Sequence, residues 1–108
     1  WLAEMPSKVN NKMIIIKGRA IAAARDLLRL TQKDLAAACG ISHATLSKIE
    51  LETVVPHAST IRKIAMELTA RGIEFSNGTG VGVRMDYKRA EAYEAAIKEA
   101  GTHDKARE

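Results

Sequence analysis

The side chains best suited to chemistry lie in residues 42–51, where small, polar and basic residues recur at helical spacing. At about 100° per residue, Ala44, Ser47, Lys48 and Leu51 share one side of a helix. The opposite side carries Leu46, Ile49 and Glu50. Small residues let a helix backbone come close to a partner, and a lysine can reach acceptors on a base or a phosphate. This pattern is typical of a helix that lies in the major groove of DNA.

No arrangement of residues in the sequence is typical of an enzyme or a metal site. The three histidines, His43, His57 and His103, lack metal-ligand spacing, and no serine or cysteine pairs with a histidine and an acid. The glycine-rich residues 76–82 are not followed by a helix at the spacing of a phosphate-binding loop. We therefore expect no enzymatic activity, no cofactor and no bound metal.

The charge of the chain is positive and unevenly distributed. The formal net charge is +4 and the isoelectric point is about 9.4. Residues 8–63 hold ten Lys and Arg against four Asp and Glu, an asymmetry that suits phosphate binding. Aromatic residues make up only 4% of the chain, too few for the stacking surfaces of single-strand binders. Double-stranded DNA is therefore the expected partner.

Other features of the composition indicate one small cytoplasmic domain. A chain of 108 residues can bury one modest core. The one cysteine, Cys39, excludes an internal disulfide and is expected to be a small buried residue. No apolar run approaches the ~20 residues of a membrane span, and no secretory signal is visible, so we expect no membrane contact.

Residues 31–50 are predicted to form two short helices joined by a tight turn. Thr31 is a suitable N-cap with Asp34 in the capping-box position, and Ser42 caps the second helix. Gly40 can adopt the left-handed conformation that ends the first helix. Both caps are flanked by apolar pairs with hydrophobic-staple spacing: Leu30 with Leu35, and Ile41 with Leu46. So short a turn forces a steep crossing angle, the geometry of a helix-turn-helix unit.

At this point the sequence resembles the Cro/CI-type (Xre-like) helix-turn-helix regulators. The resemblance depends on the pattern T-Q-x-x-L-A-x-x-x-G-I-S-x-x-T-L-S-K-I-E over residues 31–50, followed by Pro56 and a helical run over 60–65. It covers about residues 17–68. It implies a DNA-binding regulator with a four-helix domain, found in bacteria or phages, in which the second motif helix reads the major groove.

The resemblance also implies roles for individual residues. The base-facing positions would be occupied by His43, Ala44, Thr45 and Lys48, with Ser47 at their margin. Gln32 would contact a phosphate and brace the recognition helix. We further expect phosphate contacts from Lys33, Ser42 and Arg62. Gly40 and Glu50 would have structural roles.

Glu50 faces the core on the helical wheel and needs donors there. We expect these from Arg62 or Lys63, or from the N–H groups that open the next helix. After this glutamate the family commonly has a glycine or asparagine turn, from which Leu51-Glu52-Thr53 departs. Glu52 would lie near phosphates and weaken binding slightly.

A helix is expected on either side of the motif. The first begins near Gly18, with an apolar stripe toward the core and Arg19, Arg25 and Arg29 on a solvated face. The other begins at Ala58 or Ser59 and runs to about Ala70, with apolar residues at helical spacing.

The remaining residues are predicted to form a β-hairpin and a last helix. Two short apolar runs flank a turn-forming Asn77-Gly78, and the hairpin should pair with the segment around Ile14 or with a second subunit. Asp86 caps a helix to about Ala100, with Gly101 as its stop. A homodimer interface is expected from Phe75, Val81, Val83, Tyr93 and Ile97.

The sequence thus predicts a mainly α protein: a four-helix helix-turn-helix domain, then a small β-hairpin and a C-terminal helix. Its expected parts are residues 1–12, an extension that is disordered or foreign to the natural protein; 13–70, the DNA-binding domain; 71–100, the dimerisation element; and 101–108, a frayed tail. The predicted function is a transcriptional regulator, in the first place a repressor that binds an inverted repeat as a homodimer. The alternative is an antitoxin-like protein that binds a toxin partner and represses its own promoter.

Overall fold

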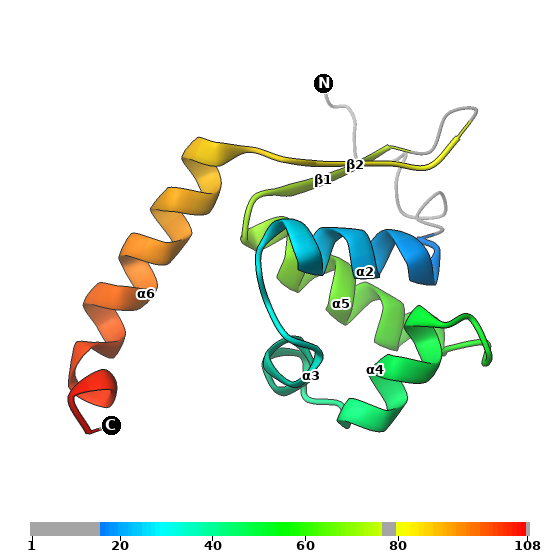
Figure 1. Ribbon diagram of the computed structural model, residues 1–108, viewed down its shortest axis with the longest axis horizontal. Helices are drawn as coiled ribbons and strands as arrows, with labels where there is room; N and C mark the ends of the chain where they lie inside the picture. Colours follow the sequence, from blue (N-terminus) through cyan, green and yellow to red (C-terminus); the bar gives the residue numbers. More distant parts are fainter. Residues whose placement is uncertain (1–15, 77–79, 108) are drawn as a thin grey trace.

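The computed structural model describes residues 16–76 and 80–107, with side chains as far as Ala100. Its order is four helices, a two-stranded hairpin and a long last helix (Figure 1), so the predicted mainly α architecture is confirmed. The elements are α2 (Gly18–Leu27), α3 (Gln32–Cys39), α4 (His43–Glu50), α5 (Ala58–Ala70), β1 (Ile73–Ser76), β2 (Gly82–Met85) and α6 (Tyr87–Arg107).

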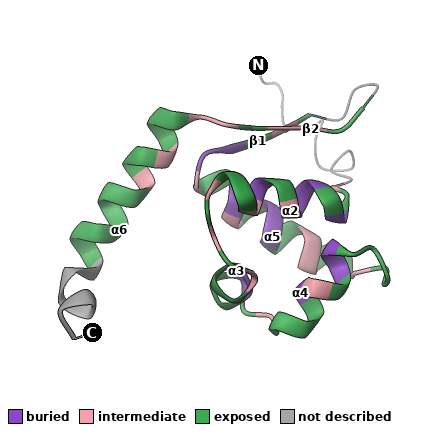
Figure 2. Ribbon diagram, viewed as in Figure 1, coloured by how far each residue is buried: buried purple, intermediate pink, exposed green. Residues whose placement is uncertain are grey.

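One hydrophobic core lies among α2, α3, α4 and α5, where the buried residues of Figure 2 converge. Each helix contributes large side chains that are almost fully buried, and β1 adds one from the hairpin. They are Ile21, Leu35, Leu46, Ile64, Leu68 and Ile73. Cys39 is buried in the same cluster, as the sequence predicted, and burial raises the pKa of its thiol.

The turn between α3 and α4 follows the local signals in the sequence. Thr31 and Asp34 form both hydrogen bonds of a capping box, at 3.0 and 3.2 Å. Gly40 has φ 73°, the left-handed conformation that ends α3 at little cost. Ser42 Oγ then accepts from Thr45 N at 3.0 Å and begins α4. The predicted helix-turn-helix is therefore present.

The hairpin pairs Ile73 with Met85 and Ser76 with Gly82 in antiparallel register, and β2 lies against α2. The expected Asn77-Gly78 turn and the Ile14 segment lie outside the described residues. Asp86 accepts from Arg89 N at 3.0 Å at the start of α6. The helix then runs away from the helical domain (Figure 1) and continues through Gly101 to Arg107. The predicted stop at Gly101 is wrong, because a glycine inside a helix costs only about 1 kcal/mol relative to alanine.

The loop after α4 is attached to the beginning of α2. Glu52 has φ 62°, and its carboxylate accepts from the backbone N–H of Arg19 at 3.1 Å and from the Arg19 guanidinium at 3.1 and 3.3 Å. Lys17, the N-cap of α2, supplies no side-chain cap, so Glu52 satisfies an N–H that opens this helix. These hydrogen bonds hold the pKa of Glu52 below its usual range and raise that of Arg19. Glu52 is thus a bonded structural group whose charge is paired with that of Arg19.

Gly18 allows α2 to approach the end of α4. A Cβ at this position would collide with the carbonyl oxygen of Ile49 and would lie 2.9 Å from that of Glu50. Both are backbone atoms, which cannot move aside as the end of a side chain can. The first turn of α2 therefore packs directly on the last turn of the second motif helix.

We expect Gly18→Ala to destabilise the protein by about 1–3 kcal/mol, because the added methyl group overpacks this contact. The matched control is Gly80→Ala, where a Cβ would meet nothing within 4 Å. Chemical denaturation of both variants checks this, and equal stability of the two would contradict the close packing.

Replacing Glu52 by Gln should lower the melting temperature at neutral pH. The pKa of Glu52 is lower in the folded protein than in the unfolded chain, so its contribution is present above the unfolded pKa, about 4.3. It is lost as the pH falls through the folded pKa. Thermal melts of parent and variant should therefore converge in acid, and a difference that stays constant with pH would argue against the carboxylate's role.

Candidate nucleic-acid interface

Helix α4 presents its small and polar side outward and its apolar side to the core. His43, Ala44, Thr45 and Lys48 are exposed, and Ser47 is half-buried at their edge. Leu46, Ile49 and Glu50 are buried. The structure therefore brings the sequence-predicted base-facing residues together on one outward surface of a single helix.

Gln32 connects this exposed face to the buried Glu50. Its Nε2 donates to Glu50 Oε1 at 2.9 Å, and its Oε1 lies 2.8 Å from His43 Nε2. Gln32 is the first residue of α3, whereas both partners belong to α4. The half-buried amide therefore fixes the position of α4 relative to α3 at both ends of α4.

The cation that neutralises Glu50 comes from α2. Arg25 donates from Nε to Glu50 Oε2 at 2.9 Å and from Nη2 to Oε1 at 3.0 Å, and its Nη1 donates to the carbonyl of Leu30 at 3.0 Å. The side chain of Arg25 is only 18% exposed and that of Glu50 only 4%. The hydrogen bonds with Glu50 raise the pKa of Arg25. A two-point contact of this kind is stronger and more directional than a surface ion pair.

The expected partners of Glu50 were therefore wrong, as was the assignment of Arg25 to a solvated face. Arg62 and Lys63 are exposed on α5. Arg25 was missed because a wheel shows which side of a helix is apolar but does not show which neighbouring helix it meets. A usable signal was present, since Arg25 lies one turn after the core residue Ile21 and so borders the apolar stripe.

The remaining predicted phosphate-contacting residues lie on the motif or beside it. Lys33 is exposed in the first turn of α3, and Arg62 is exposed in the first half of α5. Ser42 is exposed and also donates from Oγ to Thr45 Oγ1 at 2.8 Å. The N–H groups at the start of α3 and α4 add partial positive charge to this side of the domain.

Some of the residues expected at a dimer interface contact their own chain, and others are exposed. Phe75 and Val83 are half-buried and pack against the core of their own chain. The Tyr93 hydroxyl donates to Glu67 at 3.3 Å, and the Arg71 guanidinium lies 4.7 Å from the centre of its ring. Only Val81 and Ile97 expose about half of their surface, at 49% and 51%. Three of the five residues therefore make contacts within their own chain.

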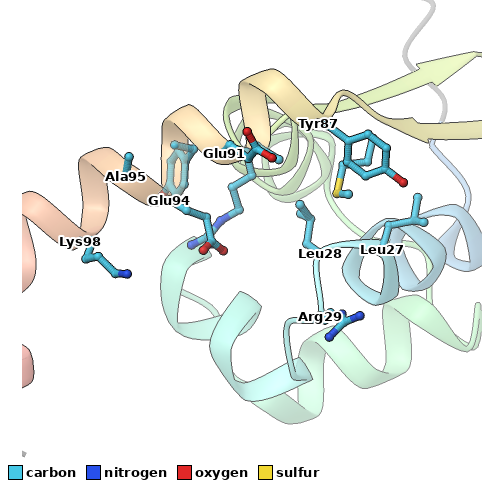
Figure 3. A pocket seen from close by; sticks show the side chains of 12 residues that line it. Leu27, Leu28, Arg29, Tyr87, Glu91, Glu94, Ala95 and Lys98 are labelled. Atoms are coloured by element: carbon cyan, nitrogen blue, oxygen red, sulfur yellow. The ribbon is translucent and has the colours of Figure 1, made fainter.

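A cavity of about 460 Å³ lies between the first turns of α6 and the end of α2 (Figure 3). Leu27, Leu28 and Tyr87 give it an apolar lining, and Glu91 and Glu94 stand at its α6 side. Within residues 16–76 and 80–100, no group of three or more His, Cys, Asp or Glu side chains could hold a metal ion.

The fold and the exposed face of α4 define a helix-turn-helix DNA-binding module. Residues 21–69 match the helix-turn-helix family HTH_3, so the chain carries a helix-turn-helix domain of the Cro/CI (Xre-like) type. That domain places the protein in the class of DNA-binding transcription regulators. A search of curated proteins gave no match. Among the described residues, no helix is both long and apolar enough to cross a membrane.

Glu50→Ala should cost about 3–5 kcal/mol of unfolding free energy, because Arg25 would remain buried without its counter-charge. In a double-mutant cycle with Arg25→Ala, the two losses should not add. The Arg19–Glu52 pair, with Arg19 77% exposed, is the matched control and should show weaker coupling. Additive losses at Arg25 and Glu50 would contradict the proposed contact.

Proposed function

We propose that this protein is a transcriptional repressor that binds an inverted repeat in double-stranded DNA as a homodimer. The observation that carries this proposal is the attachment of α4: its buried side is fixed by Arg25 and Gln32 while its small, polar side stays exposed. A rigidly held helix with such a face can read base edges, since its side chains meet the groove in one defined position.

Base recognition would come from His43, Ala44, Thr45 and Lys48, with Ser47 at the margin. Lys48 can donate to guanine, and the methyl groups of Ala44 and Thr45 suit contact with a thymine methyl. Lys33, Ser42 and Arg62 would contact phosphates. Gln32 would do so as well, because its Nε2 keeps a second N–H after donating to Glu50.

Dimerisation would involve α6 and Val81, the exposed residue directly before β2. From Glu94 to Ala100 every residue of α6 is exposed, including Ile97. An isolated helix of this length is marginal in water, so packing against a second copy would stabilise it. Two recognition helices about 34 Å apart would then meet successive major grooves on one face of the DNA.

The second candidate function is binding of a protein partner, and the cavity of Figure 3 favours it. Leu27 is 43% exposed and Tyr87 is 73% exposed beside it. An antitoxin-like protein would bind its toxin there and still repress its own promoter through α4. Co-purification with a partner from the native host, lost on Leu27→Asp, would favour this candidate.

Footprinting on the DNA that flanks the gene would test the repressor proposal. We expect a protected inverted repeat and a dimer by analytical ultracentrifugation. A protein that stays monomeric with and without this DNA would rule out the proposed binding mode.

Lys48→Ala should weaken binding to the footprinted site by about 1–3 kcal/mol and weaken binding to random DNA much less, because a base contact is lost. Lys88→Ala, which removes an exposed lysine from α6, is the matched control for net charge. Equal losses on both DNAs would make Lys48 a phosphate contact instead.

A further inference from the structure

One ring nitrogen of His43 is held by hydrogen bonds that lead into the core. Arg25 donates to both carboxylate oxygens of Glu50, and Gln32 Nε2 donates to Glu50 Oε1. Gln32 Oε1 lies 2.8 Å from His43 Nε2. The exposed imidazole therefore stands at the end of a series of four side chains.

The chemistry of these groups fixes the direction of each hydrogen bond. A carboxylate paired with an arginine is ionised and can only accept, so Gln32 must turn its NH₂ group toward Glu50. The carbonyl oxygen of Gln32 then faces His43, and it too can only accept. His43 Nε2 must therefore carry a proton, and in the neutral ring Nδ1 is an acceptor.

Nδ1 is the polar atom of this ring that stays available. Within the part of the chain that the structure describes, Nδ1 makes no hydrogen bond, and His43 is an exposed residue in the first turn of α4. A histidine without the Gln32 contact could exchange its tautomer and present either a donor or an acceptor. Here the hydrogen bonds from Arg25 through Glu50 and Gln32 select the tautomer in which Nδ1 of His43 is an acceptor.

We propose that His43 is a specificity-determining residue that accepts, through Nδ1, a hydrogen bond from an exocyclic amino group in the major groove. This inference rests on the proposed function. Adenine N6 and cytosine N4 are the amino donors there, whereas guanine and thymine present O6 and O4 acceptors. The neutral ring therefore favours adenine or cytosine over guanine or thymine at one position of the contacted strand.

The tautomer can be tested without DNA, by ¹⁵N NMR of histidine-labelled protein at pH 8, where an ordinary imidazole is neutral. We expect a single tautomer for His43, protonated at Nε2. His57 is the internal control, because no ring hydrogen bond is formed by it within the described residues, and it should exchange between tautomers. Gln32→Met should move His43 toward the same mixture. A His43 ring protonated at Nδ1 in the parent protein would overturn the proposal, whether or not the variant folds.

The base preference can be tested by selecting sites from randomised duplex DNA at the same pH. We expect the parent protein to prefer adenine or cytosine at one half-site position, and His43→Ala to lose that preference, about tenfold for one hydrogen bond. Base analogues that lack the 6-amino group of adenine or the 4-amino group of cytosine would show which base is contacted.

The proposal would be overturned if the parent protein prefers guanine or thymine at the position where His43→Ala loses its base preference. It would also be overturned if His43→Ala selects the same bases as the parent protein at every position. Selection of no sequence at all would overturn the proposed function and the base-reading role with it. The NMR result would then still stand as a property of the fold.

Discussion

The structure depends on a buried carboxylate on α4 whose hydrogen-bond donors come from two other helices, α2 and α3. Glu50 ends α4 inside the domain, and its two oxygens accept three hydrogen bonds, two from Arg25 and one from Gln32. Leaving any of these groups unpaired in a buried site would cost more than the bond contributes, so the three side chains fix one another. The same contacts determine how α4 is oriented, and hence which side chains it exposes.

Helix α2 holds the end of α4 at two points. Arg25 binds Glu50 and Arg19 binds Glu52, two acids separated by one residue, while Gly18 lets the backbones meet. The two contacts differ in strength, since Arg25 is largely buried and Arg19 is largely exposed. The first is therefore a structural anchor, and the second mainly orders the loop that follows the recognition helix. A helix that touches no base in this account thus sets the position of the helix that would.

Local features could be predicted from the sequence, and contacts between distant segments could not. The caps at Thr31 and Ser42 and the glycine turn involve residues at most five apart, and the structure contains all of them. The exposed face of α4 also followed from the wheel. The arginine partners of Glu50 and Glu52 lie 25 and 33 residues away, so their identity depends on how the helices cross. The continuation of α6 past Gly101 was missed for another reason: a glycine permits a helix to end but does not require it.

Residue-resolved amide hydrogen exchange of Glu50→Gln tests most directly whether this carboxylate holds the recognition helix. The variant keeps the side-chain size, but either orientation of its amide turns an N–H toward a donor of Arg25 or Gln32. We expect protection to fall most in α4 and at the start of α3, and much less at Ile64 and Leu68 of α5. Protection lost equally in all four helices, or unchanged in α4, would contradict this role of the carboxylate.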